Sequence, residues 1–114
     1  MNPMENNKDF WMFHGKATGN LDGKWMLFFP NSDINNAWKK ARELYDKGCL
    51  PGITLMKCST AKTISGAFSD TQKVIIFYAG PSHDEEKIGR KLVESMRYKC
   101  PGNNFVYFKT NAQT

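Results

Sequence analysis

The sequence predicts one α+β domain in two layers, a curved antiparallel sheet with its helices on one face. Short segments rich in β-branched and aromatic residues alternate with longer segments whose apolar residues recur at helical spacing. Glycine, proline and asparagine separate these segments. The resulting order is β-β-α-β-β-α-β, and an antiparallel sheet covered by helices on one side is the natural packing of that order.

The chain of 114 residues has the size of one domain. We expect the domain over residues 9–110. Residues 1–8 are polar and rich in asparagine, which predicts a flexible N-terminal tail, and residues 111–114 are expected to form a C-terminal tail. No internal repeat, low-complexity linker or shift in composition indicates a second domain.

The first two strands are expected over residues 9–14 and 24–29. The segment 17–23 between them contains glycine, asparagine and aspartate, which are typical of a hairpin turn. The second strand is apolar on both faces, which predicts that it is central in the sheet or covered on both sides, and Pro30 ends it.

The first helix is expected to begin with Asn31 or Ser32 as its cap and to run to about residue 47. Its apolar residues repeat along one stripe: Ile34, Ala37, Trp38, Ala41, Leu44 and Tyr45. Gly48 is well placed to close this helix.

The rest of the chain repeats the pattern with strands at 53–58, 73–78 and 105–109. Residues 82–85 read Ser-His-Asp-Glu, a capping box that predicts the start of the second helix. Its apolar face is expected to consist of Ile88, Gly89, Leu92, Val93 and Met96.

The composition limits the possible functions. Net charge is +5 and the pI is about 9.2, which favours a polyanionic partner such as a nucleic acid or a phosphorylated small molecule. The three cysteines are scattered and odd in number, and no apolar signal region opens the chain. We therefore expect a protein of the cytosol or nucleus, without a membrane span.

Neither a metal nor a cofactor is expected. The cysteines have no C-x-x-C spacing and no histidine close by in sequence, which argues against zinc. No glycine-rich phosphate loop of the G-x-x-x-x-G-K-[ST] type occurs.

Three stretches resemble the cap-binding translation initiation factor family in their order. They are Gly23-Lys24-Trp25-Met26-Leu27-Phe28 with a following helix that carries Trp38, Lys73-Val74-Ile75-Ile76-Phe77-Tyr78, and Ile88-Gly89-Arg90-Lys91. That family has a Gly-Lys/Arg-Trp strand, a tryptophan-bearing helix and an Ile-Gly-Arg helix in the same order. The first stretch and the segment 58–62 are more similar still to the basophilic-leukaemia-expressed protein family, which shares this fold.

The resemblance implies a nucleotide-like ligand. Cap-binding members stack a methylated guanine between two tryptophans, and a glutamate directly after one of them pairs with the base. No tryptophan here precedes a glutamate. What the resemblance carries over is therefore the phosphate end of the site, at Lys57 and Lys62.

Lys57, Ser59, Thr60 and Lys62 combine ammonium groups with hydroxyl donors at the end of a strand, a set that suits phosphate oxygens. Trp11 is expected to offer a face for base stacking. The alternative for these residues is a solvated loop beside core aromatics. We predict a non-catalytic binding module for a nucleotide-like or RNA ligand.

Two other functions stay open. The first is a metal-independent phosphodiesterase or nuclease with His14 as general base, although His14 and His83 lack the His-x-Thr/Ser context of two-histidine phosphodiesterases. The second is a protein-interaction adaptor that uses basic residues on the helices. These are Lys39, Lys40, Arg42 and Lys87.

Overall fold

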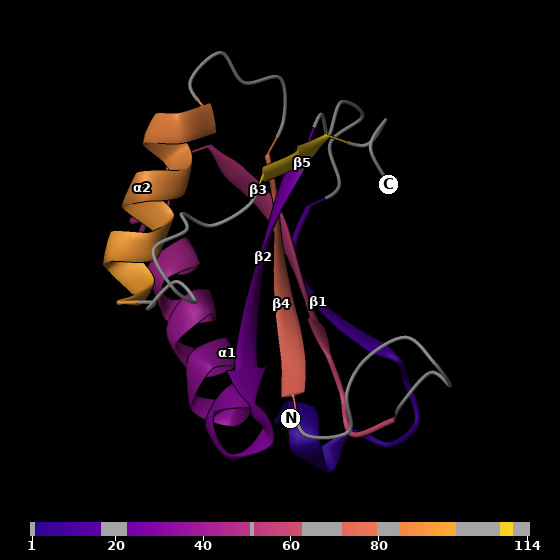
Figure 1. The fold of residues 1–114 in the computed structure, drawn as a ribbon. Coiled ribbons are helices and arrows are strands. Elements are labelled where there is room, and N and C mark those ends of the chain that lie inside the picture. The colour runs from indigo at the N-terminus through magenta and orange to yellow at the C-terminus, as the bar shows by residue number, and fades with distance from the viewer. Residues whose placement is uncertain are drawn as a thin grey trace.

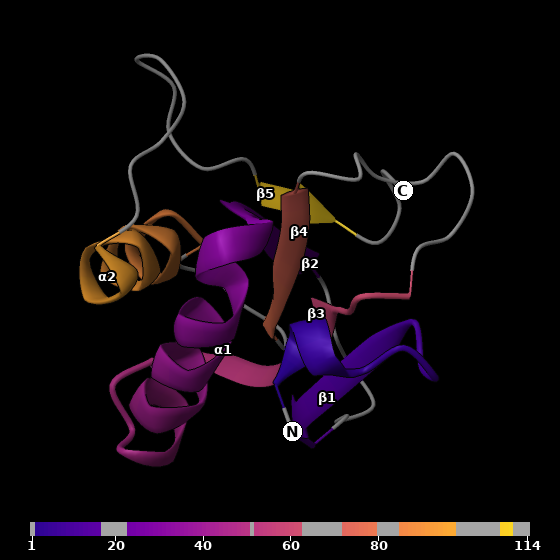
Figure 2. The same ribbon diagram turned by 90° about the horizontal axis from the view of Figure 1, so that it is seen from below.

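The computed structural model describes residues 2–16, 23–50, 52–62, 72–79, 85–97 and 108–110. The predicted α+β class and element order are confirmed, and a short 3-10 helix precedes them. The elements are η1 (Pro3–Glu5), β1 (Trp11–Gly15), β2 (Gly23–Pro30), α1 (Asn31–Asp46), β3 (Ile53–Ser59), β4 (Gln72–Ala79), α2 (Glu85–Met96) and β5 (Phe108–Thr110). Both α-helices lie on the same side of the sheet (Figures 1 and 2).

The sheet has the strand order β1-β3-β4-β2-β5, and every pairing is antiparallel. The predicted hairpin between the first two strands is therefore wrong, because β1 pairs with β3 and not with β2. β2 instead pairs along its whole length with β4, a β-branched and aromatic strand at the centre of the sheet. β2 keeps the interior position that its two apolar faces predict, while residues 17–22 lie outside the described part.

The core fills the space between the sheet and the two helices. Trp25 of β2 pairs with Phe77 of β4, which in turn pairs with Met56 of β3. Paired residues project from the same face of a sheet, and all three are buried together with α1 and α2 residues. The predicted α1 stripe is confirmed, since Trp38 and its helical neighbours Ile34 and Ala41 are buried.

The ends of α1 are only partly as predicted. Pro30 occupies the cap position and no side chain caps the helix, so the expected cap at Asn31 or Ser32 is wrong. Pro30 has φ −58° and ψ 153°, the extended backbone that is usual for the residue just before a helix. At the other end Gly48 adopts φ +73°, which confirms its role in closing the helix.

The predicted apolar face of α2 is confirmed. Gly89, Leu92 and Met96 are buried and Ile88 and Val93 are partly buried. The predicted capping box at 82–85 and most of the predicted strand at 105–109 lie outside the described residues, as do residues 111–114. None of the described helices is long and apolar enough to cross a bilayer.

Pro3, Met4 and Asn6 are packed against the domain, so residues 3–6 do not form the loose tail that was predicted for residues 1–8. Pro3 is buried and its carbonyl accepts a hydrogen bond from the Ala61 amide at 3.0 Å. The Met4 amide donates to Asn35 Oδ1 of α1 at 3.0 Å, and the Met4 side chain packs on the core. The apolar pair Pro3-Met4 thus outweighs the polar composition around it, because it gains burial against α1.

Candidate functional site

The sheet has one face that α1 and α2 do not cover. Strand alternation places on it the residues next to those that point into the core, and the registers Phe13↔Lys57↔Ile76↔Met26 and Leu55↔Tyr78↔Lys24 align them across strands. We call this surface the open face and define it by Trp11, Phe13, Lys24, Met26, Phe28, Lys57 and Tyr78. Phe13 is 63% and Phe28 39% exposed, so large apolar side chains meet solvent on this face.

Aromatic rings and lysines alternate across the open face. Lys57 Nζ lies 4.2 Å from the centroid of the Trp11 ring and 5.7 Å from that of Tyr78. Lys24 Nζ lies 6.0 Å from the Tyr78 centroid. Trp11, Lys57, Tyr78 and Lys24 come from β1, β3, β4 and β2, which is the order of these strands in the sheet. We call these four residues the aromatic–lysine row.

Ser59 and Thr60, two predicted ligand residues, are engaged inside the fold. Ser59 is 5% exposed, and its Oγ accepts from the Val74 amide at 2.8 Å, which joins β3 to β4. Thr60 is fully buried, and its Oγ1 donates to the Asp9 carbonyl and accepts from the Lys62 amide. Their predicted role as phosphate donors does not fit this arrangement, because both hydroxyls already serve to hold backbone segments together.

Lys62 has partners different from those of Lys57. Its Nζ donates to the Lys8 carbonyl at 3.2 Å and lies 4.5 Å from the centroid of the Phe10 ring. Within the part of the chain that the structure describes, no contact joins Lys62 to the Trp11–Lys57 pair. The two predicted phosphate lysines therefore do not form one cluster.

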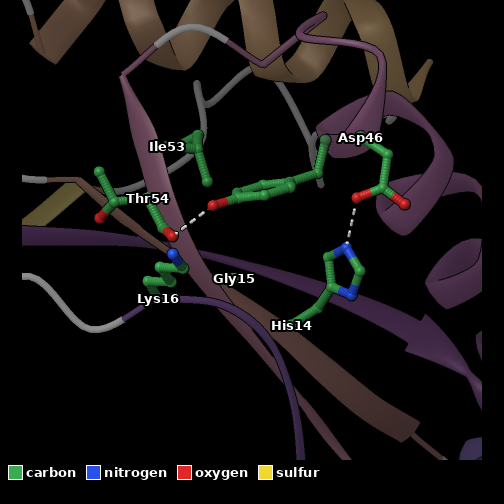
Figure 3. A pocket seen from close by; sticks show the side chains of 7 residues that line it. His14, Gly15, Lys16, Asp46, Ile53 and Thr54 are labelled. Carbon is green, nitrogen blue, oxygen red and sulfur yellow. Dashed lines mark hydrogen bonds and ion pairs between the residues drawn. The ribbon is translucent and has the colours of Figure 1, made fainter.

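His14 faces the helices, opposite Trp11, as strand alternation predicts. Its Nε2 is 2.8 Å from Asp46 Oδ1, and its ring meets that of Tyr45 edge-on at 5.2 Å (Figure 3). Both partners belong to the last turns of α1, so His14 ties β1 to the end of the helix. A shallow hollow lies beside this pair, lined by residues 14–16, 45–46 and 53–54.

The basic residues of α1 differ in their surroundings. Lys39 is exposed, whereas Lys40 Nζ donates to the Met96 carbonyl of α2 at 3.4 Å. The Arg42 guanidinium lies 5.9 Å from the Trp38 ring centroid. The side chain of Lys87 lies outside the described residues.

Cys58 has the environment of a structural thiol. Burial raises the pKa of Cys58, and the positive charges of Arg42 and Lys73 offset this only in part. Such a thiol stays protonated and is a poor nucleophile. Cys49 is a free thiol too, and Cys100 lies outside the described part. Among the described residues no group of three or more histidine, cysteine or acidic side chains could hold a metal ion.

The Cys58 thiol should make the protein less stable at alkaline pH. Below the usual thiol pKa of 9.0, the folded and unfolded states both carry the proton, so the group contributes nothing. Above it the unfolded state loses the proton and the folded state keeps it, so the free energy of unfolding falls by about 1.4 kcal/mol per pH unit. Urea unfolding from about pH 8 to pH 10 measures this slope.

Cys58→Ala should lose this part of the alkaline slope whatever its own cavity costs, because the cavity term does not depend on pH. Cys49→Ala is the matched control and should retain it. Equal slopes in the wild type and both variants would mean that the Cys58 thiol ionises in the folded state.

The sequence predicts Trp11 and Lys57 as ligand residues but does not single out Tyr78 and Lys24, which complete the aromatic–lysine row. Alternation along β4 does put Tyr78 on the face opposite Phe77. Its meeting with Lys57 and Lys24 depends on which strands flank β4, and no local pattern of the sequence specifies that.

The chain matches the model of the family described as basophilic leukemia-expressed protein Bles03 over residues 9–114, and it belongs to this family. The predicted resemblance to that family is thus confirmed. No curated protein matches the chain.

Proposed function

We propose that this member of the Bles03 family is a non-catalytic module that binds a nucleotide-like or RNA ligand on the open face. The observation that carries the proposal is the aromatic–lysine row, which alternates two rings with two ammonium groups across the strands. Bases stack on aromatic rings and phosphates pair with ammonium groups, which is how single-stranded nucleic acid is commonly held.

The lysines of the row lie close to the rings that would stack with bases. A cation–π contact at an exposed site contributes about 0.5–1 kcal/mol. Stacking of a base on an aromatic ring contributes about 1–3 kcal/mol, and the displaced ammonium gains a phosphate partner. One base stack therefore contributes at least as much as the cation–π contact that it replaces.

The overall charge supports the same ligand class. The chain carries +5, and Lys24 and Lys57 bring two of its positive charges to the open face. We further propose that the fold is related to that of the cap-binding initiation factors, which place basic residues at the strand that matches β3. Lys57 is the residue of β3 that fits this role.

Loss of a ring and loss of a charge from the row should each weaken binding, but in different ways. Trp11→Leu should raise the Kd for a single-stranded RNA octamer about 5- to 150-fold, the equivalent of one lost stack. Lys57→Gln should also lower the slope of log K against log salt by about 0.7, because one phosphate contact is lost. Fluorescence anisotropy of a labelled octamer between about 50 and 200 mM KCl measures both.

Lys39→Gln is the control for the charge, since Lys39 is an exposed lysine on α1, away from the open face. It should leave the salt slope nearly unchanged. Wild-type affinity in both Trp11→Leu and Lys57→Gln, with the fold verified by circular dichroism, would reject the open face as the site.

A metal-independent phosphodiesterase is the second candidate, and the His14–Asp46 pair favours it. A carboxylate that orients a histidine is the usual arrangement of a general base, and the two groups are 2.8 Å apart beside a hollow. Breakdown of RNA by the wild type but not by His14→Gln would support this function. Intact RNA, or an unchanged rate in the variant, would reject it.

Binding to a protein partner becomes the favoured function if no nucleotide or RNA binds. Lys39 is the basic residue of α1 that is exposed for such a contact. A Lys39→Glu variant that loses a captured partner while Lys57→Gln retains it would support that alternative.

A further inference from the structure

We infer that the ligand of the open face is a single-stranded nucleic acid of at least two nucleotides. One base would stack on Trp11 and another on Tyr78, with the phosphate between them on Lys57. This inference rests on the proposed function and names the ligand class of the same site.

The two rings of the row belong to strands that are not neighbours. Trp11 is opposite Ser59, and Tyr78 is opposite Leu55, so the two positions differ by two strands across the sheet and four residues along it. With about 4.8 Å between strands and about 3.3 Å per residue, their Cα atoms lie roughly 16 Å apart. Each ring therefore offers its own stacking surface.

Lys57 connects the two surfaces. It is a residue of β3, the strand between β1 and β4. Its Nζ is 4.2 Å from one ring centroid and 5.7 Å from the other, so the centroids lie within about 10 Å of one another. Once bases displace it from the two rings, this ammonium can contact the phosphate that joins them.

The row continues past the second ring to Lys24 on β2, whose Nζ lies 6.0 Å from the Tyr78 ring centroid. The resulting order of ring, cation, ring and cation matches the order of base, phosphate, base and phosphate along a nucleic acid strand. A mononucleotide can satisfy only one ring and one cation. A dinucleotide or longer strand can satisfy the whole row.

The row also selects against duplexes. Bases in a duplex are stacked about 3.4 Å apart and paired, so their faces are not available to aromatic side chains. Bases of a single strand can be splayed apart and stacked on separate rings, which is the common mode of sequence-tolerant recognition.

A length series of 5′-phosphorylated oligoadenylates tests the inference. Mono-, di-, tetra- and octanucleotides compete with a labelled single-stranded octamer in fluorescence anisotropy. We expect the dinucleotide to bind about 5- to 150-fold more tightly than AMP, the gain from one additional stacked base. A duplex octamer should bind more weakly than either of its strands.

Tyr78→Leu is the decisive variant. It should remove most of the gain from one to two nucleotides and change the affinity for AMP by at most about two-fold, since Trp11 remains. Phe10→Leu is the matched control, because Phe10 is an exposed aromatic residue that does not belong to the open face. It should leave the ratio between dinucleotide and AMP unchanged.

The outcomes separate the inference from the function on which it rests. Equal affinity for AMP and dinucleotide, or tighter binding of the duplex, would overturn the length inference and leave the nucleotide module standing. Absence of binding by every member of the series, including the octamer, would overturn both. A Tyr78→Leu variant that keeps the full gain would reject Tyr78 as the second stacking surface.

Discussion

Phe77→Ala should lower the free energy of unfolding by about 3–5 kcal/mol, the usual cost of removing a fully buried phenylalanine. Phe77 is 0% exposed and lies on β4, the central strand. It pairs with Trp25 on one side and Met56 on the other, and all three belong to the core that the helices cover. Since a domain is stable by only about 5–15 kcal/mol, this loss can leave a large unfolded fraction.

Phe13→Ala is the matched control, because it makes the same chemical change on the opposite face of the sheet. Phe13 is 63% exposed, so its removal should change stability by about 0.5 kcal/mol or less. Urea unfolding followed by far-ultraviolet circular dichroism compares the two variants with the wild type. Similar losses would contradict the assignment of one sheet face to the core and the other to solvent.

Local patterns were enough to predict the helices. The stripe of α1 has apolar residues at helical spacing, and the same spacing identifies Ile34, Trp38 and Ala41 as buried. The closing role of Gly48 also follows from the local backbone, since its φ of +73° is one that glycine adopts readily. The helix start was less predictable, because Pro30 and the polar residues after it all suit that position.

The order of strands in the sheet depends on long-range pairing. Turn residues between two strands predict a hairpin, yet β1 crosses to pair with β3. The segment 17–23 has the composition of a turn whether or not it joins neighbouring strands. β2 pairs with β4 through residues about fifty positions apart in the sequence, and local turn composition does not specify such a long-range pairing.

The candidate site was only partly predictable, because it also depends on long-range strand pairing. Trp11 and Lys57 were expected to bind ligand for separate reasons, and the antiparallel pairing of β1 with β3 brings them together. Ser59 and Thr60 were expected beside them because their hydroxyls suit phosphate. The backbone uses those hydroxyls instead, in hydrogen bonds that no spacing rule predicts.

One face of the sheet belongs to the core, and the other carries the residues proposed to bind ligand. Residues of the aromatic–lysine row are partly exposed, so substitutions there remove less buried surface than substitutions at Phe77. Val74 and Ile76 are buried, and strand alternation places them on the same side of β4 as Tyr78. Binding variants should therefore be made in the row and not in these two residues, whose loss would confuse affinity with folding.

Gly15→Ala should be the most damaging small substitution at the end of β1. Gly15 has φ +104°, a backbone conformation that costs a non-glycine residue about 1–3 kcal/mol. A Cβ there would lie 2.5 Å from the Thr54 carbonyl oxygen and 2.8 Å from Tyr45 Oη. That carbonyl accepts hydrogen bonds from Tyr45 Oη at 2.7 Å and from the Lys16 amide at 3.1 Å.

Two costs therefore add at Gly15. One is the strained backbone, and the other is the displacement of a carbonyl that accepts two hydrogen bonds. We expect the free energy of unfolding to fall by about 2–5 kcal/mol. Gly48→Ala separates them, because Gly48 also has a positive φ but its Cβ would meet nothing within 4 Å. It should cost only about 1–2 kcal/mol of backbone strain. Thermal and urea unfolding measure both variants. Equal losses of stability in the two variants would show that backbone strain is the whole cost. In that case β1 would not approach β3 and α1 as closely as the His14–Asp46 and Tyr45–Thr54 contacts require.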